Sequence, residues 1–98
     1  MAYYAVIYTY SSDRTTQDQH RPEHRAYLTQ LAEQGTLVAS GPMLETEPAT
    51  ALLIFRAESQ QQIRALLAGD PFQQLGQVAQ TDVAEWNPVI GILAAEQG

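Results

Sequence analysis

The sequence contains two histidines, and one of them, His24, lies among apolar side chains. His24, Tyr27, Leu28 and Leu31 recur at the i, i+3, i+4, i+7 spacing that is typical of the buried face of an amphipathic helix. We therefore expect the imidazole to face a sheet, or a cleft beside one, where it needs a polar partner. An imidazole held by a carboxylate is a good general base near neutral pH, because the carboxylate fixes its tautomer and raises its basicity.

Asp70 is the candidate partner of His24. It lies seven residues after Ile63, on the continuation of the inward stripe of a second predicted helix and just beyond Gly69. If the two helices lie antiparallel on one face of a sheet, His24 and Asp70 can meet. An alternative stays open, in which Asp70 is only a turn or capping residue before Pro71 and His24 is a satisfied structural histidine.

Other candidate residues give weaker signals. His20 and His24 have the i, i+4 spacing of metal ligands, but Pro22 lies between them and is expected to begin the helix, so they need not share a face. No metal site is predicted. Ser40 stands at the end of a predicted strand, where its hydroxyl can line a pocket or simply belong to a turn.

The composition limits the possible chemistry. The chain has no cysteine and no lysine, which excludes disulfides, thiolate chemistry and Schiff bases. It has no glycine-rich phosphate loop and no Gly-x-Ser-x-Gly elbow, and no cofactor is expected. A net charge of −6 with only five arginines opposes nucleic-acid binding, which needs clustered cations.

The elements that must position these residues follow from periodicity and capping signals. A strand is predicted at Ala2–Tyr10, a loop at 11–21, a helix from Pro22 to a stop at Gly35, strands at Thr36–Pro42 and Ala51–Arg56, a second helix between a Ser59 capping box and Gly69, a compact turn at 70–76, and a strand at Gln77–Trp86. This is the ferredoxin-like βαββαβ order, an α+β fold with two helices on one face of a four-stranded antiparallel sheet. We expect one domain over residues 1–98, with 89–98 as an apolar tail.

Strands 2–10 and 51–56 are apolar on both faces. Only one face can be covered by the helices, so the sequence predicts a homodimer in which the two sheets pack face to face. Tyr4, Tyr8 and Tyr10 are accordingly interpreted as interface core in preference to acids. The start of the chain resembles a strand more than a signal peptide, and no apolar run is long enough to span a bilayer. A soluble, cytoplasmic protein without membrane or nucleic-acid partners is expected.

Four short motifs carry a family resemblance. "RPEHRAYL", "ASGPM", "GDPF" and the late "EW", in this order over the chain, resemble the YCII-related (YciI-like) family of the dimeric α/β-barrel superfamily. The resemblance implies a ferredoxin-like fold that dimerises through its sheets and an active site centred on a histidine and an aspartate. Carried over by position, these two residues are His24 and Asp70. The residues assigned to substrate binding are Arg21, Ser40, Gly41, Pro42 and Phe72.

The best understood members of this family remove HCl from small chlorinated hydroxyquinone-type aromatics. We therefore expect a cofactor-independent lyase, of dehydrochlorinase type, or an isomerase acting on a small aromatic or enolic metabolite. His24 would abstract a proton, Asp70 would orient the imidazole, and Arg21 or backbone amides near Gly41 would steady the developing negative charge. The alternative is a non-catalytic module of the same dimeric fold that binds a small ligand or docks another protein.

Overall fold

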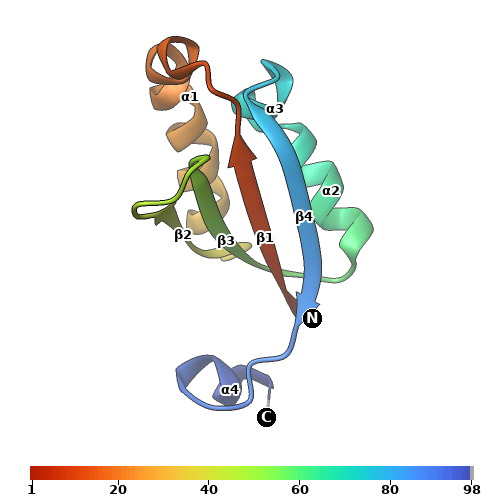
Figure 1. Cartoon of the computed structure of the whole chain (residues 1–98). Coiled ribbons are helices and arrows are strands. Elements are labelled where there is room, and N and C mark those ends of the chain that lie inside the picture. The colour runs from red at the N-terminus through yellow and green to blue at the C-terminus, as the bar shows by residue number, and fades with distance from the viewer. Residues whose placement is uncertain (98) are drawn as a thin grey trace.

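The computed structural model describes residues 1–97, and the side chains of residues 1–94. Its elements are β1 (Ala2–Tyr10), α1 (Arg14–Glu33), β2 (Leu37–Met43), β3 (Thr50–Ala57), α2 (Gln60–Ala68), α3 (Pro71–Gln74), β4 (Val78–Trp86) and α4 (Ile92–Gln97). The four strands form one antiparallel sheet in the order β2-β3-β1-β4, and α1 and α2 lie behind it in Figure 1. The predicted ferredoxin-like α+β fold is confirmed.

The core lies between the sheet and the two long helices. On β1, Tyr4, Val6 and Tyr8 face inward and are paired with inward residues of β3. The strand and helix residues that close the core are Leu53, Phe55, Leu28, Leu31, Ile63 and Leu67. Alternate apolar residues of the strands thus pack against the predicted apolar faces of the two helices, on one side of the sheet.

Helix α1 begins eight residues earlier than predicted, so the assignment of residues 11–21 to a loop is wrong for residues 14–21. Asp13 is the N-cap, and its carboxylate accepts a hydrogen bond from the backbone N–H of Thr16 at 3.1 Å. Gln17 is buried on the inward face, and its side-chain amide donates to the Ser11 carbonyl at 2.8 Å. Pro22 therefore lies inside the helix, where it leaves one intrahelical hydrogen bond unmade.

The other helix ends agree with the predicted caps. Gly35 adopts a left-handed backbone, with φ of 81°, and the N–H of Thr36 donates to the Leu31 carbonyl in the Schellman arrangement. Ser59 caps α2 by accepting from the N–H of Gln62 at 3.1 Å. The predicted turn after α2 contains one short helix, α3, which begins at Pro71.

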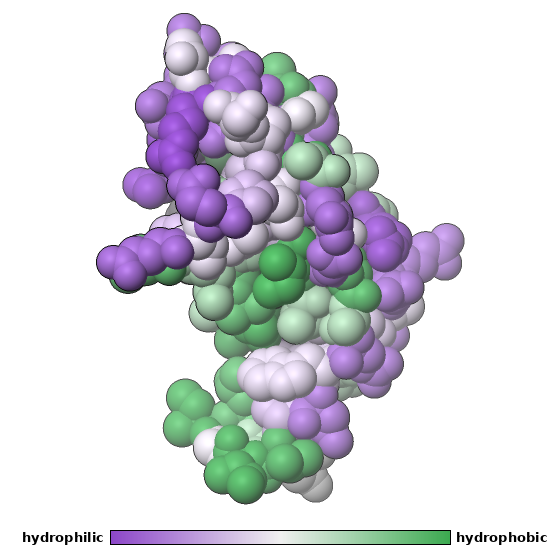
Figure 2. Space-filling model, viewed as in Figure 1, coloured by the Kyte–Doolittle hydropathy of each residue, from purple (hydrophilic) through white to green (hydrophobic). Residues whose placement is uncertain are grey.

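The face of the sheet opposite the helices is apolar at its centre. Ile7 and Leu52 are cross-strand partners there, and both side chains remain partly exposed. In Figure 2, which is turned toward this face, apolar groups gather over the middle of the sheet and again on the C-terminal segment. That segment carries α4 away from the sheet (Figure 1), and Ile90 and Ile92 within it are 91% and 87% exposed. Among the described helices, none is both long and apolar enough to cross a bilayer.

Candidate active site

His24 and Asp70 are in contact, as the inward stripes of the two helices predicted. The imidazole Nδ1 lies 2.7 Å from the Asp70 Oδ1. Because an ionised carboxylate can only accept hydrogen bonds, Nδ1 is the donor and the neutral ring keeps its lone pair on Nε2. His24 stands in the middle of α1 and not at its start, since the helix begins earlier than expected.

The Asp70 carboxylate is fully buried and accepts two more hydrogen bonds. The Tyr8 hydroxyl donates to Oδ2 at 2.9 Å, and the backbone N–H of Phe72 donates to Oδ1 at 3.0 Å. Tyr8 therefore belongs to the helix-side core and to the site. Tyr4 and Tyr10 lie on the same side of the sheet, so the interpretation of these three tyrosines as part of a sheet-to-sheet interface is wrong. Sequence reasoning missed the contact between Tyr8 and Asp70 because it depends on how two segments 62 residues apart come together.

The segment Gly69–Phe72 explains how the carboxylate reaches the histidine. Asp70 is the N-cap of α3 and Pro71 occupies its first turn, so the aspartate is both a capping residue and the partner of His24. The Phe72 ring stacks on the imidazole, with centroids 4.0 Å apart and planes inclined by 5°. The ring orientation is thereby fixed from two sides, by a hydrogen bond at its edge and by an aromatic face.

His24 Nε2 is the free nitrogen of this arrangement. Within the described part of the chain, every buried side-chain nitrogen and oxygen has a hydrogen-bond partner. Nε2 makes no hydrogen bond to another described residue, so it cannot belong to this buried set. It is therefore accessible from outside the protein, although the His24 side chain as a whole is only 10% exposed. His24 lines a cavity, and the nitrogen that Asp70 leaves unused is therefore available to a molecule in it.

Three tyrosines surround the aspartate, and their pKa values are all raised. Burial is the main cause of the raised pKa of Tyr8, of Tyr10 and of Tyr27, and the negative charge of Asp70 adds to it in each case. The nearby Arg21 partly offsets the rise in the pKa of Tyr10. These phenols are therefore protonated at neutral pH and act as neutral groups around a buried anion.

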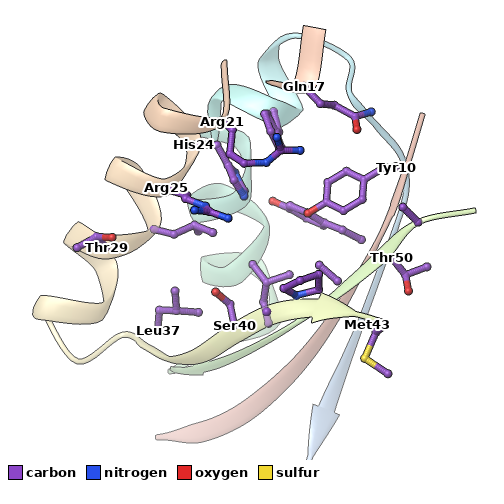
Figure 3. Close-up of a pocket in the computed structure, with 18 of the residues that line it drawn as sticks. Tyr10, Gln17, Arg21, His24, Arg25, Thr29, Leu37, Ser40, Met43 and Thr50 are labelled. Carbon is purple, nitrogen blue, oxygen red and sulfur yellow. The ribbon is translucent and has the colours of Figure 1, made fainter. Parts of the chain in front are cut away.

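The cavity beside His24 has a volume of about 630 Å³ and lies between α1 and β2. This volume is in the range of small-molecule sites, which is about 300–1,000 Å³. All the residues assigned to substrate binding line it: Arg21, Ser40, Gly41, Pro42 and Phe72. Ser40 and Pro42 are the cross-strand partners of the inward residues Leu53 and Ala51, so they lie on the inward face of the sheet. Figure 3 shows Ser40 directed toward α1.

Arg14, Tyr10 and Arg25 also line the cavity, and none of them was predicted to do so. Arg14 lies in the part of α1 that was assigned to a loop, and Arg25 has a polar side chain outside the apolar stripe. His20 pairs with Glu23 at 3.2 Å and does not join His24. No group of three or more potential metal ligands occurs among the described residues.

The fold and the site define a class of small α+β proteins that hold a buried histidine–aspartate pair next to an open cavity. Residues 1–87 match the YCII-related domain, and the chain belongs to this family. The tail after residue 87 lies outside the match.

One protein is similar to the chain in sequence and one solved structure is similar to it in fold. The chain is 35% identical over 68 residues to the derivative of benzaldehyde biosynthesis cluster protein C of Emericella nidulans, an alignment that covers 60% of this chain and 69% of that protein. The structure is similar, with a TM-score of 0.74, to 5-chloro-2-hydroxyhydroquinone dehydrochlorinase of Burkholderia phenoliruptrix in complex with 2,5-dihydroxybenzoquinone. That likeness covers 86% of this chain and 92% of the dehydrochlorinase, with 23% sequence identity.

Proposed function

We propose that this protein is an enzyme of the lyase or isomerase type, in which His24 removes a proton from a small aromatic or enolic metabolite. The observation that carries the proposal is the buried Asp70–His24 hydrogen bond, which leaves Nε2 as the acceptor nitrogen at a cavity of suitable size. The dehydrochlorinase with a similar fold was solved with a small quinone bound, which supports a ligand of that kind.

In the proposed reaction, Nε2 takes a proton from the substrate and the imidazole becomes a cation that the Asp70 carboxylate stabilises. The electron pair of the broken bond to hydrogen moves into the substrate as an enolate. In a lyase the enolate then expels a leaving group such as chloride, and in an isomerase it accepts the proton at another atom. Arg21 and the backbone around Gly41 line the same cavity, and in this proposal they stabilise the negative oxygen.

The first test is a kinetic comparison of the wild-type protein with three variants on chlorinated and unchlorinated hydroxyquinols, followed by absorbance and by chloride release. We expect His24→Gln and Asp70→Asn each to lower kcat by about 10²–10⁴-fold, the usual contribution of a general base. The control is His20→Gln, which removes the exposed histidine that pairs with Glu23 and should keep full activity. Turnover that survives in His24→Gln would exclude this mechanism and would favour a role in binding alone.

We also propose that the protein works as a homodimer joined through the open face of the sheet. The partly exposed Ile7 and Leu52 at the centre of that face support the proposal, because apolar patches of this kind usually mark interfaces. The exposed Val89, Ile90 and Ile92 of the C-terminal segment extend the apolar surface beyond the sheet. The helix side, with the cavity, stays open to substrate in such a dimer.

A further inference from the structure

The cavity beside His24 collects positive charge on an acidic protein. Three of the five arginines of the chain line it, Arg14, Arg21 and Arg25, while the chain as a whole has a net charge of −6. Asp18 is the one carboxylate among the lining residues, and it is bound to Arg21. Arginines therefore outnumber carboxylates around this cavity even when the buried Asp70 behind His24 is included, and this excess of positive charge favours an anion.

Arg25 is the arginine best placed to use that charge near the reacting atoms. Its side chain has no ion pair or hydrogen bond with any residue in the part of the chain that the structure describes, whereas Arg21 is held by Asp18. Figure 3 shows Arg25 beside His24 on α1, with its guanidinium directed into the space between the helix and β2. An unpaired guanidinium at the wall of a cavity keeps all its donors available to a ligand.

The opposite wall supplies a second donor. Ser40 is paired with Leu53 and faces α1 across the cavity, and its hydroxyl makes no hydrogen bond to another residue within positions 1–97. A planar guanidinium facing a hydroxyl suits a carboxylate, whose two oxygens can accept from both. His24 precedes Arg25 on α1 and lines the same cavity, with its ring held in place by the buried Phe72 ring stacked behind it.

We infer that Arg25 and Ser40 form a carboxylate subsite, and that the substrate is a small aromatic or enolic acid whose ring lies beside His24 in the cavity. This inference rests on the proposed function, because it places the carboxylate relative to the base that acts on the ring. It assigns to Arg25 the selection of charged over neutral substrates. It also explains why an acidic chain places three arginines around one cavity.

The test compares two probes of similar shape that differ at one group, the anionic carboxylate of 2,5-dihydroxybenzoate and the neutral amide of 2,5-dihydroxybenzamide. Their dissociation constants are measured by calorimetry and by amide chemical shifts at neutral pH, in the wild-type protein, Arg25→Gln, His24→Gln and Arg64→Gln. Arg64 is an exposed arginine on α2 outside this cavity, so its variant is the matched control for loss of one positive charge. Dispersed amide spectra establish that each variant is folded.

We expect the wild-type protein to bind the acid at least about tenfold more tightly than the amide, because a hydrogen bond to a charged group changes the dissociation constant by at least this factor. The preference should persist in Arg64→Gln and His24→Gln and fall to about threefold or less in Arg25→Gln. Equal affinities in the wild-type protein, a preference that survives Arg25→Gln, or binding of neither probe would overturn the inference.

The outcome is separable from that of the proposed reaction. A charge preference that depends on Arg25, in a protein whose turnover does not depend on His24, would refute the base and leave the subsite standing. Turnover that requires His24, in a protein that binds the acid and the amide equally well, would refute the subsite and leave the proposed base standing.

Discussion

Asp70 is the residue around which the site is built. A buried carboxylate without partners costs several kcal/mol, so its burial is tolerated only where donors replace water. The His24 ring, the Tyr8 hydroxyl and the Phe72 N–H supply three such donors. The same contacts hold the imidazole in one tautomer, so the interactions that allow the charge to be buried also prepare the proposed base.

Tyr8 should make the free energy of unfolding depend on pH at high pH. Its pKa is raised in the folded protein by burial and by Asp70, while in the unfolded chain it stays near 10. Below pH 10 both states keep the phenol proton and Tyr8 adds no pH dependence. Above it the unfolded chain loses the proton and the folded one does not, so stability falls as pH rises.

We expect Tyr8→Phe to remove that part of the pH dependence. At pH 11, one unit above the pKa in the unfolded chain, Tyr8 should have lowered the free energy of unfolding of the wild-type protein by about 1.4 kcal/mol relative to neutral pH. The free energy of unfolding of Tyr8→Phe should therefore fall by about 1.4 kcal/mol less over the same pH range. The variant should also be less stable at neutral pH by about 1.5–3 kcal/mol, because it lacks a hydrogen bond to a charged group. Urea unfolding at about pH 7, 9 and 11 measures both effects. An equal loss in the two proteins at high pH would contradict the assignment.

At the scale of elements, Gly69 makes room for the Tyr27 side chain of α1 at the C-terminal end of α2. A Cβ at this position would lie 2.4 Å from the Tyr27 hydroxyl oxygen and 2.9 Å from the ring carbon that bears it. That hydroxyl donates to the Leu66 carbonyl at 2.7 Å, so it is held in place. Gly69 thus serves packing, and its φ of −83° needs no left-handed backbone.

We expect Gly69→Ala to destabilise the protein by about 1–3 kcal/mol, the usual cost of overpacking. The matched control is Gly41→Ala, because a Cβ there meets nothing within 4 Å. This control should be neutral or slightly stabilising. Thermal or urea unfolding of both variants checks the prediction, and equal effects would show that Tyr27 moves aside without cost. Since Asp70 follows Gly69 directly, Gly69→Ala should also weaken the proposed activity.

Element order was predictable because it depends on local patterns, namely apolar alternation, the Ser59 cap and the Gly35 stop. The two inward stripes allowed His24 and Asp70 to meet but left a purely capping role for Asp70 open, and the family resemblance then favoured the pair. The first two turns of α1 were not predictable in this way, because Pro22 resembles a helix start and Gln17 is a polar residue on the inward face. The lining roles of Arg14 and Arg25 depend on the space between α1 and β2, which no local pattern reports.

For the whole molecule, the proposed dimer rests on the open face of the sheet. One side of the sheet is closed by α1 and α2, while the other leaves apolar side chains in contact with water. Burial of such surface is worth about 25 cal/mol per Å², so two copies gain most by joining these faces. A charge at the centre of the face would have to be buried without a partner in the dimer, which costs far more than it does in the monomer.

We therefore expect light scattering at micromolar concentration to give twice the 10.8 kDa chain mass for the wild-type protein and a single chain mass for Leu52→Glu. Leu52 is the cross-strand partner of Ile7 on the open face, so the new carboxylate would meet the facing sheet. The control is Gln61→Glu, which adds the same charge at an exposed position of α2 and should remain dimeric. Circular dichroism of both variants separates dissociation from unfolding. A wild-type protein that is monodisperse at the mass of one chain would refute the dimer, and the open face would then need another explanation.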